Sequence, residues 1–150
     1  MKIKYLALAL LPLSLLACNK AQNGFDDAIV QIHEIDQENL IGYNWTYQGS
    51  NASQPLVVTF GDDKAFSIET GCNNHGGTWD IEDHKILTSE LVATMLSCPE
   101  DLMAQEYLAN DIFSEKKLPF EIHIENHKAH LTITDSKGQK RVFLGNKETS

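Results

Sequence analysis

The sequence predicts an α+β fold in which short antiparallel strands are interrupted by one helix, over about residues 99–114. The chain has 150 residues, 42% of them hydrophobic, which suits one compact domain and argues against disorder along most of its length. After Leu40, most of the sequence consists of short runs in which apolar and polar residues alternate between Gly, Asp and Asn residues, a pattern typical of strands and turns. A single stretch has the composition and the start signals of a helix.

The N-terminus predicts a lipoprotein signal peptide over residues 1–17. Two lysines precede an apolar run, residues 5–16, that is short for a membrane span. The run ends in Leu15-Leu16-Ala17-Cys18, which resembles the bacterial lipobox. We therefore expect Cys18 to carry diacylglycerol and an N-linked palmitate. A plain secreted protein cut nearby is the alternative.

Signal cleavage makes the mature chain more acidic. It leaves 10 basic and 21 acidic residues, a net charge of −11. No Lys/Arg cluster remains to neutralise phosphates, so we expect no nucleic-acid partner. The acylated Cys18 makes the membrane a partner, because several acyl chains give stable anchoring. Asn19 after the cysteine, in place of Asp, favours the outer membrane and a periplasm-facing domain.

Residues 18–38 are expected to be a lipidated N-terminus, a polar tether and a lead-in segment. Phe25–Glu38 fits a helix or a strand, since its isoleucines recur at helical spacing but are β-branched. The domain itself is expected over residues 39–146.

Alternation predicts the strands. In the first half we expect strands over residues 43–47, 56–60, 65–69, 76–81 and 85–87, with turns at 61–64 and 82–84. In the last third, residues 120–124 and 129–133 form a hairpin about Asn126-His127, followed by a strand over 141–144. This turn pairs three apolar residues with three others: Phe120 with Ile133, Ile122 with Leu131 and Ile124 with Ala129.

The helix has a recognisable start. Pro99 suits the first helical position, Ser97 or Cys98 suits the cap, and two acidic residues follow at the positive end of the helix dipole. Apolar residues cover most of its circumference, so we expect strands to pack on several of its sides. Glu106 lies among them, and we expect its carboxylate to be partly buried and paired.

Two cysteines remain once Cys18 is acylated. Cys72 and Cys98 are expected to form a disulfide, because an even pair in an oxidising compartment is usually bonded. Free structural thiols are one alternative. The other is catalysis, with Cys72 as the nucleophile and His75 as its base.

The histidines permit a metal hypothesis that we do not favour. In the predicted hairpin, His123 and His130 face each other and Glu121 lies two residues along the same face, a set that could bind zinc with one water. A solvent-facing strand surface needs polar residues in any case, so we expect no metal site.

Several spaced motifs resemble the META domain family, which includes the HslJ-like heat-shock lipoproteins. Residues 70–79 resemble its G-C-N-x-x-x-G-x-aromatic signature, and residues 40–45 resemble its L-x-G-x-x-W opening. Residues 94–98 resemble its T-M-M-A-C segment, with Leu96 and Ser97 as mild departures. The resemblance extends from Leu40 to Gly145.

This resemblance implies a single α+β domain with a barrel-like antiparallel sheet, one helix, no cofactor and no known reaction. The side chains themselves favour structural roles. Gly71 and Gly77 would permit special backbone conformations, and Asn73 and Asn74 would hydrogen-bond the backbone of the turn between these two glycines. Trp79 would be buried. The motif positions expected to be structural are Gly71, Asn73, Gly77, Trp79, Thr94, Met103 and Glu106.

We expect a monomeric, non-enzymatic, lipid-anchored envelope protein that serves stress or antibiotic tolerance by binding a partner that the sequence does not identify. The alternative is an acidic inhibitor or scavenger of cationic proteins, such as lysozyme, or of cationic drugs, since the negative field attracts basic partners. A further alternative is a barrel interior that holds an acyl chain or a protein tail.

Overall fold

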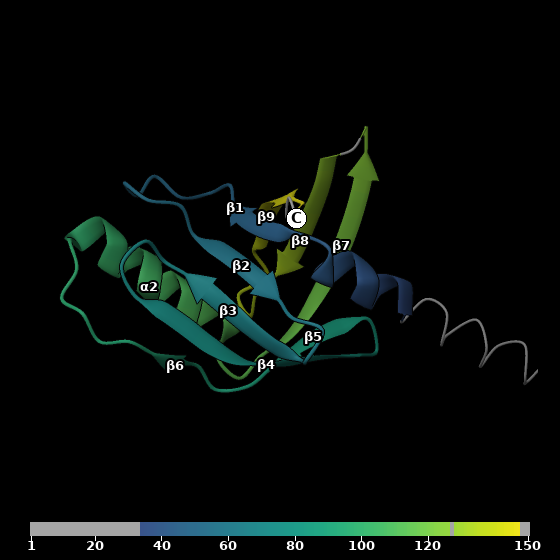
Figure 1. Ribbon diagram of the computed structural model, residues 1–150, viewed down its shortest axis with the longest axis horizontal. Helices are drawn as coiled ribbons and strands as arrows, with labels where there is room; N and C mark the ends of the chain where they lie inside the picture. The colour runs from purple at the N-terminus through teal and green to yellow at the C-terminus, as the bar shows by residue number, and fades with distance from the viewer. Residues whose placement is uncertain (1–33, 127, 148–150) are drawn as a thin grey trace, which may run out of the picture.

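The computed structural model describes residues 34–126 and 128–147 (Figure 1), which form a closed antiparallel β-barrel with two helices. The signal peptide, Cys18, the tether and most of the lead-in segment lie outside the described residues, as does His127 of the predicted turn. The strands are β1 (Asn44–Tyr47), β2 (Val57–Phe60), β3 (Ala65–Glu69), β4 (Asn74–Glu82), β5 (Lys85–Thr88), β6 (Val92–Ala93), β7 (Lys117–Glu125), β8 (Lys128–Thr134) and β9 (Lys140–Asn146).

The barrel closes through β4. The strand order is β3-β2-β1-β9-β8-β7-β5-β4, and an additional pairing between β3 and β4 joins the two ends. β4 serves both neighbours because it is long: its first half pairs with β3 and its second half with β5. The short β6, which alternation did not predict, pairs with the first half of β4.

The predicted β7–β8 hairpin is confirmed in its register. Phe120 lies opposite Ile133, and the pairing continues to Glu125 opposite Lys128, which leaves two residues for the turn. Asn126, the first of them, has a φ of 50°, as tight hairpin turns require. The end of the hairpin extends beyond the barrel (Figure 1), so Ile124 is exposed although it pairs as predicted.

α2 (Glu100–Phe113) is the predicted helix, with two corrections. It begins one residue later than expected: Pro99 occupies the cap position, and no side chain caps the helix. The expectation of packing on several sides is wrong, because the buried residues form one stripe and Tyr107 is 70% exposed. That stripe consists of Leu102, Gln105, Ala109, Ile112 and Phe113.

A second helical segment, residues 34–41, corrects the expectation of a single helix. The end of the lead-in segment, whose sequence fitted a helix or a strand, is therefore helical. Its Leu40 is fully buried, and the Leu40 carbonyl accepts a 2.9 Å hydrogen bond from the Trp45 indole N–H. The segment is thereby fixed against β1. No helix within the described ranges is both long enough and apolar enough to cross a membrane.

Aromatic side chains fill the centre of the barrel. Trp45, Phe60, Phe113 and Phe143 are fully buried and come from β1, β2, α2 and β9. The Phe113 and Phe143 rings lie 6.1 Å apart, centroid to centroid, in an edge-to-face arrangement that aromatic pairs favour. Side chains therefore occupy the central volume that an interior acyl chain or protein tail would need.

Candidate functional site

α2 separates two polar arrangements. The first, which we call the motif corner, consists of residues 70–73, residues 94–98 and Glu106. Gln105, its neighbour, faces a pocket beneath the loop that follows β1, which we call the helix pocket. Both arrangements join segments that are distant in sequence.

The disulfide of the motif corner is present as predicted. Cys72 and Cys98 are bonded, with their Cα atoms 6.1 Å apart, so the loop after β3 is attached to the start of α2. Cys72 is therefore not a free thiol, which contradicts both the free-thiol alternative and the catalytic pairing of Cys72 with His75.

His75 has a different environment from the one that a catalytic base needs. Its side chain is buried on β4, opposite Ile68, and its Nε2 has no hydrogen-bond partner. Burial lowers the pKa of His75, and the nearby Glu106 carboxylate only partly opposes this effect. The imidazole is therefore neutral at neutral pH.

Asn73 is the centre of the motif corner. Its buried amide donates to Glu106 Oε1 at 2.7 Å and to the Leu96 carbonyl at 3.2 Å. Its Oδ1 accepts from the Leu96 N–H at 2.8 Å and from Thr94 Oγ1 at 2.9 Å. The expectation that Asn73 and Asn74 bond the backbone of the turn between Gly71 and Gly77 is wrong. The Asn73 side chain bonds residues of other segments, and Asn74 is an exposed residue that begins β4.

Glu106 is partly buried and paired, as predicted. Its Oε1 also accepts from the Asn73 backbone N–H at 3.3 Å and lies 3.2 Å from Cys98 Sγ. Across the described ranges, the one side-chain group with ligand atoms close enough for a metal is Cys72, Cys98 and Glu106. Because the two sulfurs are bonded to each other, this group offers no thiolates to a metal.

The two motif glycines are required for different reasons. Gly71 has a φ of +86°, and a Cβ there would lie 2.3 Å from the Gln54 Cβ. Gly77 has no such φ, which corrects the expectation of a special backbone conformation there. Instead, a Cβ would lie 2.8 Å from the Phe66 ring. Trp79 is buried as expected, and its indole N–H donates to the Gly61 carbonyl at 3.0 Å.

Three further residues, His123, His130 and Met103, lie where the sequence placed them. His123 pairs directly opposite His130. His123 Nε2 lies 3.6 Å from a carboxylate oxygen of Glu125, not of Glu121. Met103 lies one turn before Glu106 on α2 and is half-buried.

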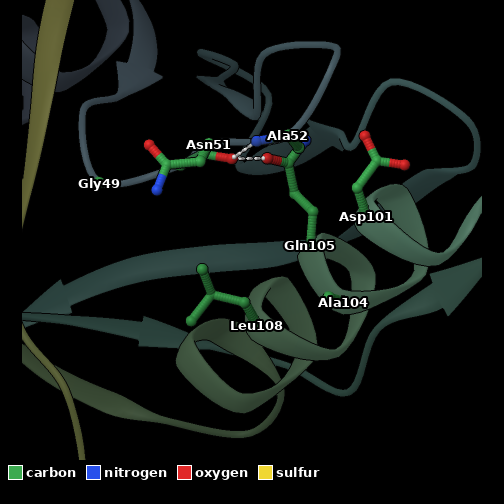
Figure 2. Close-up of a pocket in the computed structure, with 8 residues that line it drawn as sticks. Gly49, Asn51, Ala52, Asp101, Ala104, Gln105 and Leu108 are labelled. Atoms are coloured by element: carbon green, nitrogen blue, oxygen red, sulfur yellow. Dashed lines mark hydrogen bonds between the residues drawn. The ribbon is translucent and has the colours of Figure 1, made fainter.

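The helix pocket lies between α2 and the loop of Gly49–Ala52 (Figure 2), and its volume is about 300 Å³. Ala104 and Leu108 form its apolar floor, and Asp101 lies at its rim. Its eight lining residues are Gly49, Ser50, Asn51, Ala52, Asp101, Ala104, Gln105 and Leu108.

Hydrogen bonds hold the pocket open. The Ser50 hydroxyl donates to Gln105 Oε1, and Gln105 Nε2 donates to the Thr70 carbonyl at 2.8 Å. At the rim, the Ser53 N–H donates to Asp101 Oδ2 at 2.8 Å. Hydrogen bonds from Ser53, side chain first and then backbone, lower the pKa of Asp101, so the rim stays anionic.

Sequence reasoning missed this pocket. One available signal was Gln105, a polar residue that lies on the same helical stripe as Leu102 and Ala109. A buried amide must find hydrogen-bond partners. Its position therefore indicated a polar contact, although not with which loop.

Comparisons with known proteins agree with this architecture. The META domain family matches residues 38–148, which confirms the resemblance seen in the sequence. An NMR structure of a protein from Burkholderia xenovorans is similar, with a TM-score of 0.57 and 13% identity over 77% of this chain and 88% of that one. A second NMR structure has a TM-score of 0.54 and 15% identity over 71% and 92%. At these identities the likeness shows the fold alone. No curated protein matches the sequence significantly.

Proposed function

The chain belongs to the META domain family, and from that premise we propose a lipid-anchored, non-enzymatic protein that serves envelope stress or antibiotic tolerance by binding a ligand in the helix pocket. Family membership supports a protein of the bacterial envelope type. The Leu15-Leu16-Ala17-Cys18 sequence supports the anchor on Cys18 and the periplasm-facing outer-membrane location.

The observation that carries the binding proposal is the combination of an apolar floor with one anionic rim. Leu108 and Ala104 offer apolar contact, and Asp101 offers a carboxylate that stays charged. An apolar pocket with a few placed polar groups is the usual form of a small-molecule site. The ligand class that fits is an amphipathic cation, with its ammonium group at Asp101 and its apolar body on the floor.

The same lining residues support binding over catalysis. Asp101 is the one ionisable side chain among the eight. The Ser50 hydroxyl donates to Gln105 and accepts from the Ala52 N–H at 3.1 Å, so no general base contacts it. A serine nucleophile needs such a base.

Titration with hexylammonium chloride, followed by backbone NMR shifts, tests the pocket, with hexanol as the uncharged control probe. Asp101→Asn should weaken hexylammonium binding about tenfold, because a charge-assisted hydrogen bond is lost. Glu100→Gln is the matched control: it removes the same charge from the next residue, outside the pocket. Equal losses of hexylammonium affinity in the two variants would show that binding depends only on the overall negative charge of the protein. This result would refute the site.

The anchor has its own test. Mass spectrometry of the processed protein should show a chain that begins at Cys18 and carries the mass of its acyl chains, and Cys18→Ala should abolish both the acylation and the signal cleavage that follows it. A processed wild-type chain without acyl mass would contradict the anchor and leave the pocket proposal standing.

A second candidate function is an acidic inhibitor or scavenger of cationic proteins such as lysozyme. It is favoured by the charge distribution: residues 86–115 contain six acidic residues and no Lys, Arg or His. Such a field attracts basic partners at low salt and is screened at high salt. The test is retention of lysozyme by immobilised protein at low and high salt, and no retention at low salt would discard this function.

A further inference from the structure

The segment from β6 to the start of α2 presents apolar side chains to solvent. Val92 is 77% exposed, Met95 96% and Leu96 62%. Single exposed apolar residues are ordinary, but several together mark an interaction surface. We call residues 92–98 the presenting loop.

The backbone of this loop is held in place. The buried Asn73 amide bonds both the N–H and the carbonyl of Leu96, and the Thr94 N–H donates to the Asn74 carbonyl at 3.1 Å. The disulfide fixes Cys98 at the end of the loop. A buried polar network and a covalent bond thus position a segment whose apolar side chains contact no core. Such a pre-organised surface loses little conformational entropy when it binds.

Acidic residues flank the presenting loop at both ends. Glu90 precedes it, and the Glu115 N–H donates to the Ser89 carbonyl at 2.9 Å, which brings a second acid to that end. Glu100 and Asp101 follow the loop. Glu90, Glu100 and Glu115 are in no ion pair with any part of the chain that the structure describes.

Positive charge gathers elsewhere. Lys128 and Lys147 line a depression of about 600 Å³ beside β8 and β9. The free end of the β7–β8 hairpin and β6 lie on opposite sides of the molecule (Figure 1). Lys85 and Lys116 lie just outside the acidic residues 86–115, which contain no basic residue.

We propose that the presenting loop docks a cationic, apolar segment of a partner protein. The proposal rests on the second candidate function and names its binding surface. Met95 and Leu96 supply apolar contact, while the flanking carboxylates attract basic side chains and speed their encounter. The same carboxylates disfavour an anionic membrane surface as the occupant.

The test uses the full lipidated chain in neutral detergent, with detergent alone as the blank. The probe is a labelled peptide of alternating lysine and leucine, and binding is read by fluorescence anisotropy. Met95→Ser combined with Leu96→Ser should raise the Kd at least about tenfold, because the apolar anchors are lost. Ile35→Ser combined with Ile124→Ser is the matched control, since it removes two exposed apolar residues from other surfaces and should change nothing.

Charge variants extend the test. Glu90→Gln combined with Glu100→Gln should weaken peptide binding at low salt and have no effect at high salt. If wild-type protein does not bind the peptide, this proposal and the second candidate function both fail. If it binds and the Met95/Leu96 variant binds equally well, the proposal fails while that function stands. If the variant loses binding only to vesicles of phosphatidylethanolamine and phosphatidylglycerol, the occupant is a membrane and the proposal is overturned.

Discussion

The motif corner and the wall formed by β7, β8 and β9 are stabilised in different ways. The wall consists of consecutive strands in a regular antiparallel ladder, with six residue pairs between β7 and β8. The motif corner joins residues 70–73, residues 94–98 and Glu106 through side-chain hydrogen bonds and a disulfide. Stability in the wall is therefore spread over many equivalent contacts, whereas in the corner it depends on a few side chains.

The buried carboxylate of the wall is held by local contacts. Asp135 is buried at the turn between β8 and β9. Burial alone would raise its pKa, but hydrogen bonds from the Gln139 N–H, the Arg141 side chain and the Lys137 N–H together lower it. All three donors lie within six residues of Asp135. In the corner, by contrast, Asn73 and Glu106 are 33 residues apart.

Removal of the disulfide should be the largest single loss in the corner. Cys72→Ser combined with Cys98→Ser should lower the free energy of unfolding by about 3–4 kcal/mol, because the unfolded chain gains the entropy of an open loop. Urea unfolding measures this loss, and wild-type protein in reductant should behave like the variant. Unchanged unfolding midpoints in both cases would show that the corner does not depend on its crosslink.

Asn73→Ala should cost about 2–3 kcal/mol, because it leaves the Leu96 N–H without its acceptor and removes the 2.7 Å hydrogen bond to the Glu106 carboxylate in a partly buried site. Asn74→Ala is the matched control, one residue away and exposed, and should cost less than about 0.5 kcal/mol. The comparison uses urea unfolding of the two variants. Equal costs in the two variants would show that the Asn73 side-chain hydrogen bonds do not stabilise the motif corner.

The same contrast explains what the sequence could predict. The hairpin register follows from alternation around Asn126, and the Cys72–Cys98 bond follows from the count of cysteines in an oxidising compartment. Local pattern determines both. Barrel closure was implied only by the family resemblance, because it depends on the pairing of β1 with β9 and of β5 with β7, which lie far apart in the sequence. No periodicity specifies which distant strands meet.

The candidate sites could be predicted only in part. Helical spacing placed Glu106 among apolar residues and so indicated its burial. It did not indicate that Asn73 would be its partner. The helix pocket depends on a contact between Gln105 and Ser50, which are 55 residues apart. Periodicity carries no information about such pairs.

Glu106→Ala should destabilise the protein by about 1–2 kcal/mol, since the Asn73 amide loses a charge-assisted acceptor. Glu100→Ala, at an exposed first-turn position on the same helix, should cost about 0.5 kcal/mol through the helix dipole. Thermal unfolding ranks the two variants. Equal melting temperatures would mean that the Glu106 contacts add nothing beyond an ordinary surface carboxylate.

The smallest expected effect is a pH dependence. Because burial lowers the pKa of His75 below its ordinary value of 6.5, the unfolded chain binds more protons than the folded one just below pH 6.5. The free energy of unfolding should therefore fall as the pH drops through that window. His75→Leu should flatten this part of the pH profile, whatever it does to stability at neutral pH. A profile equally steep in the His75 variant would show that a group other than His75 causes the acid sensitivity in this pH range.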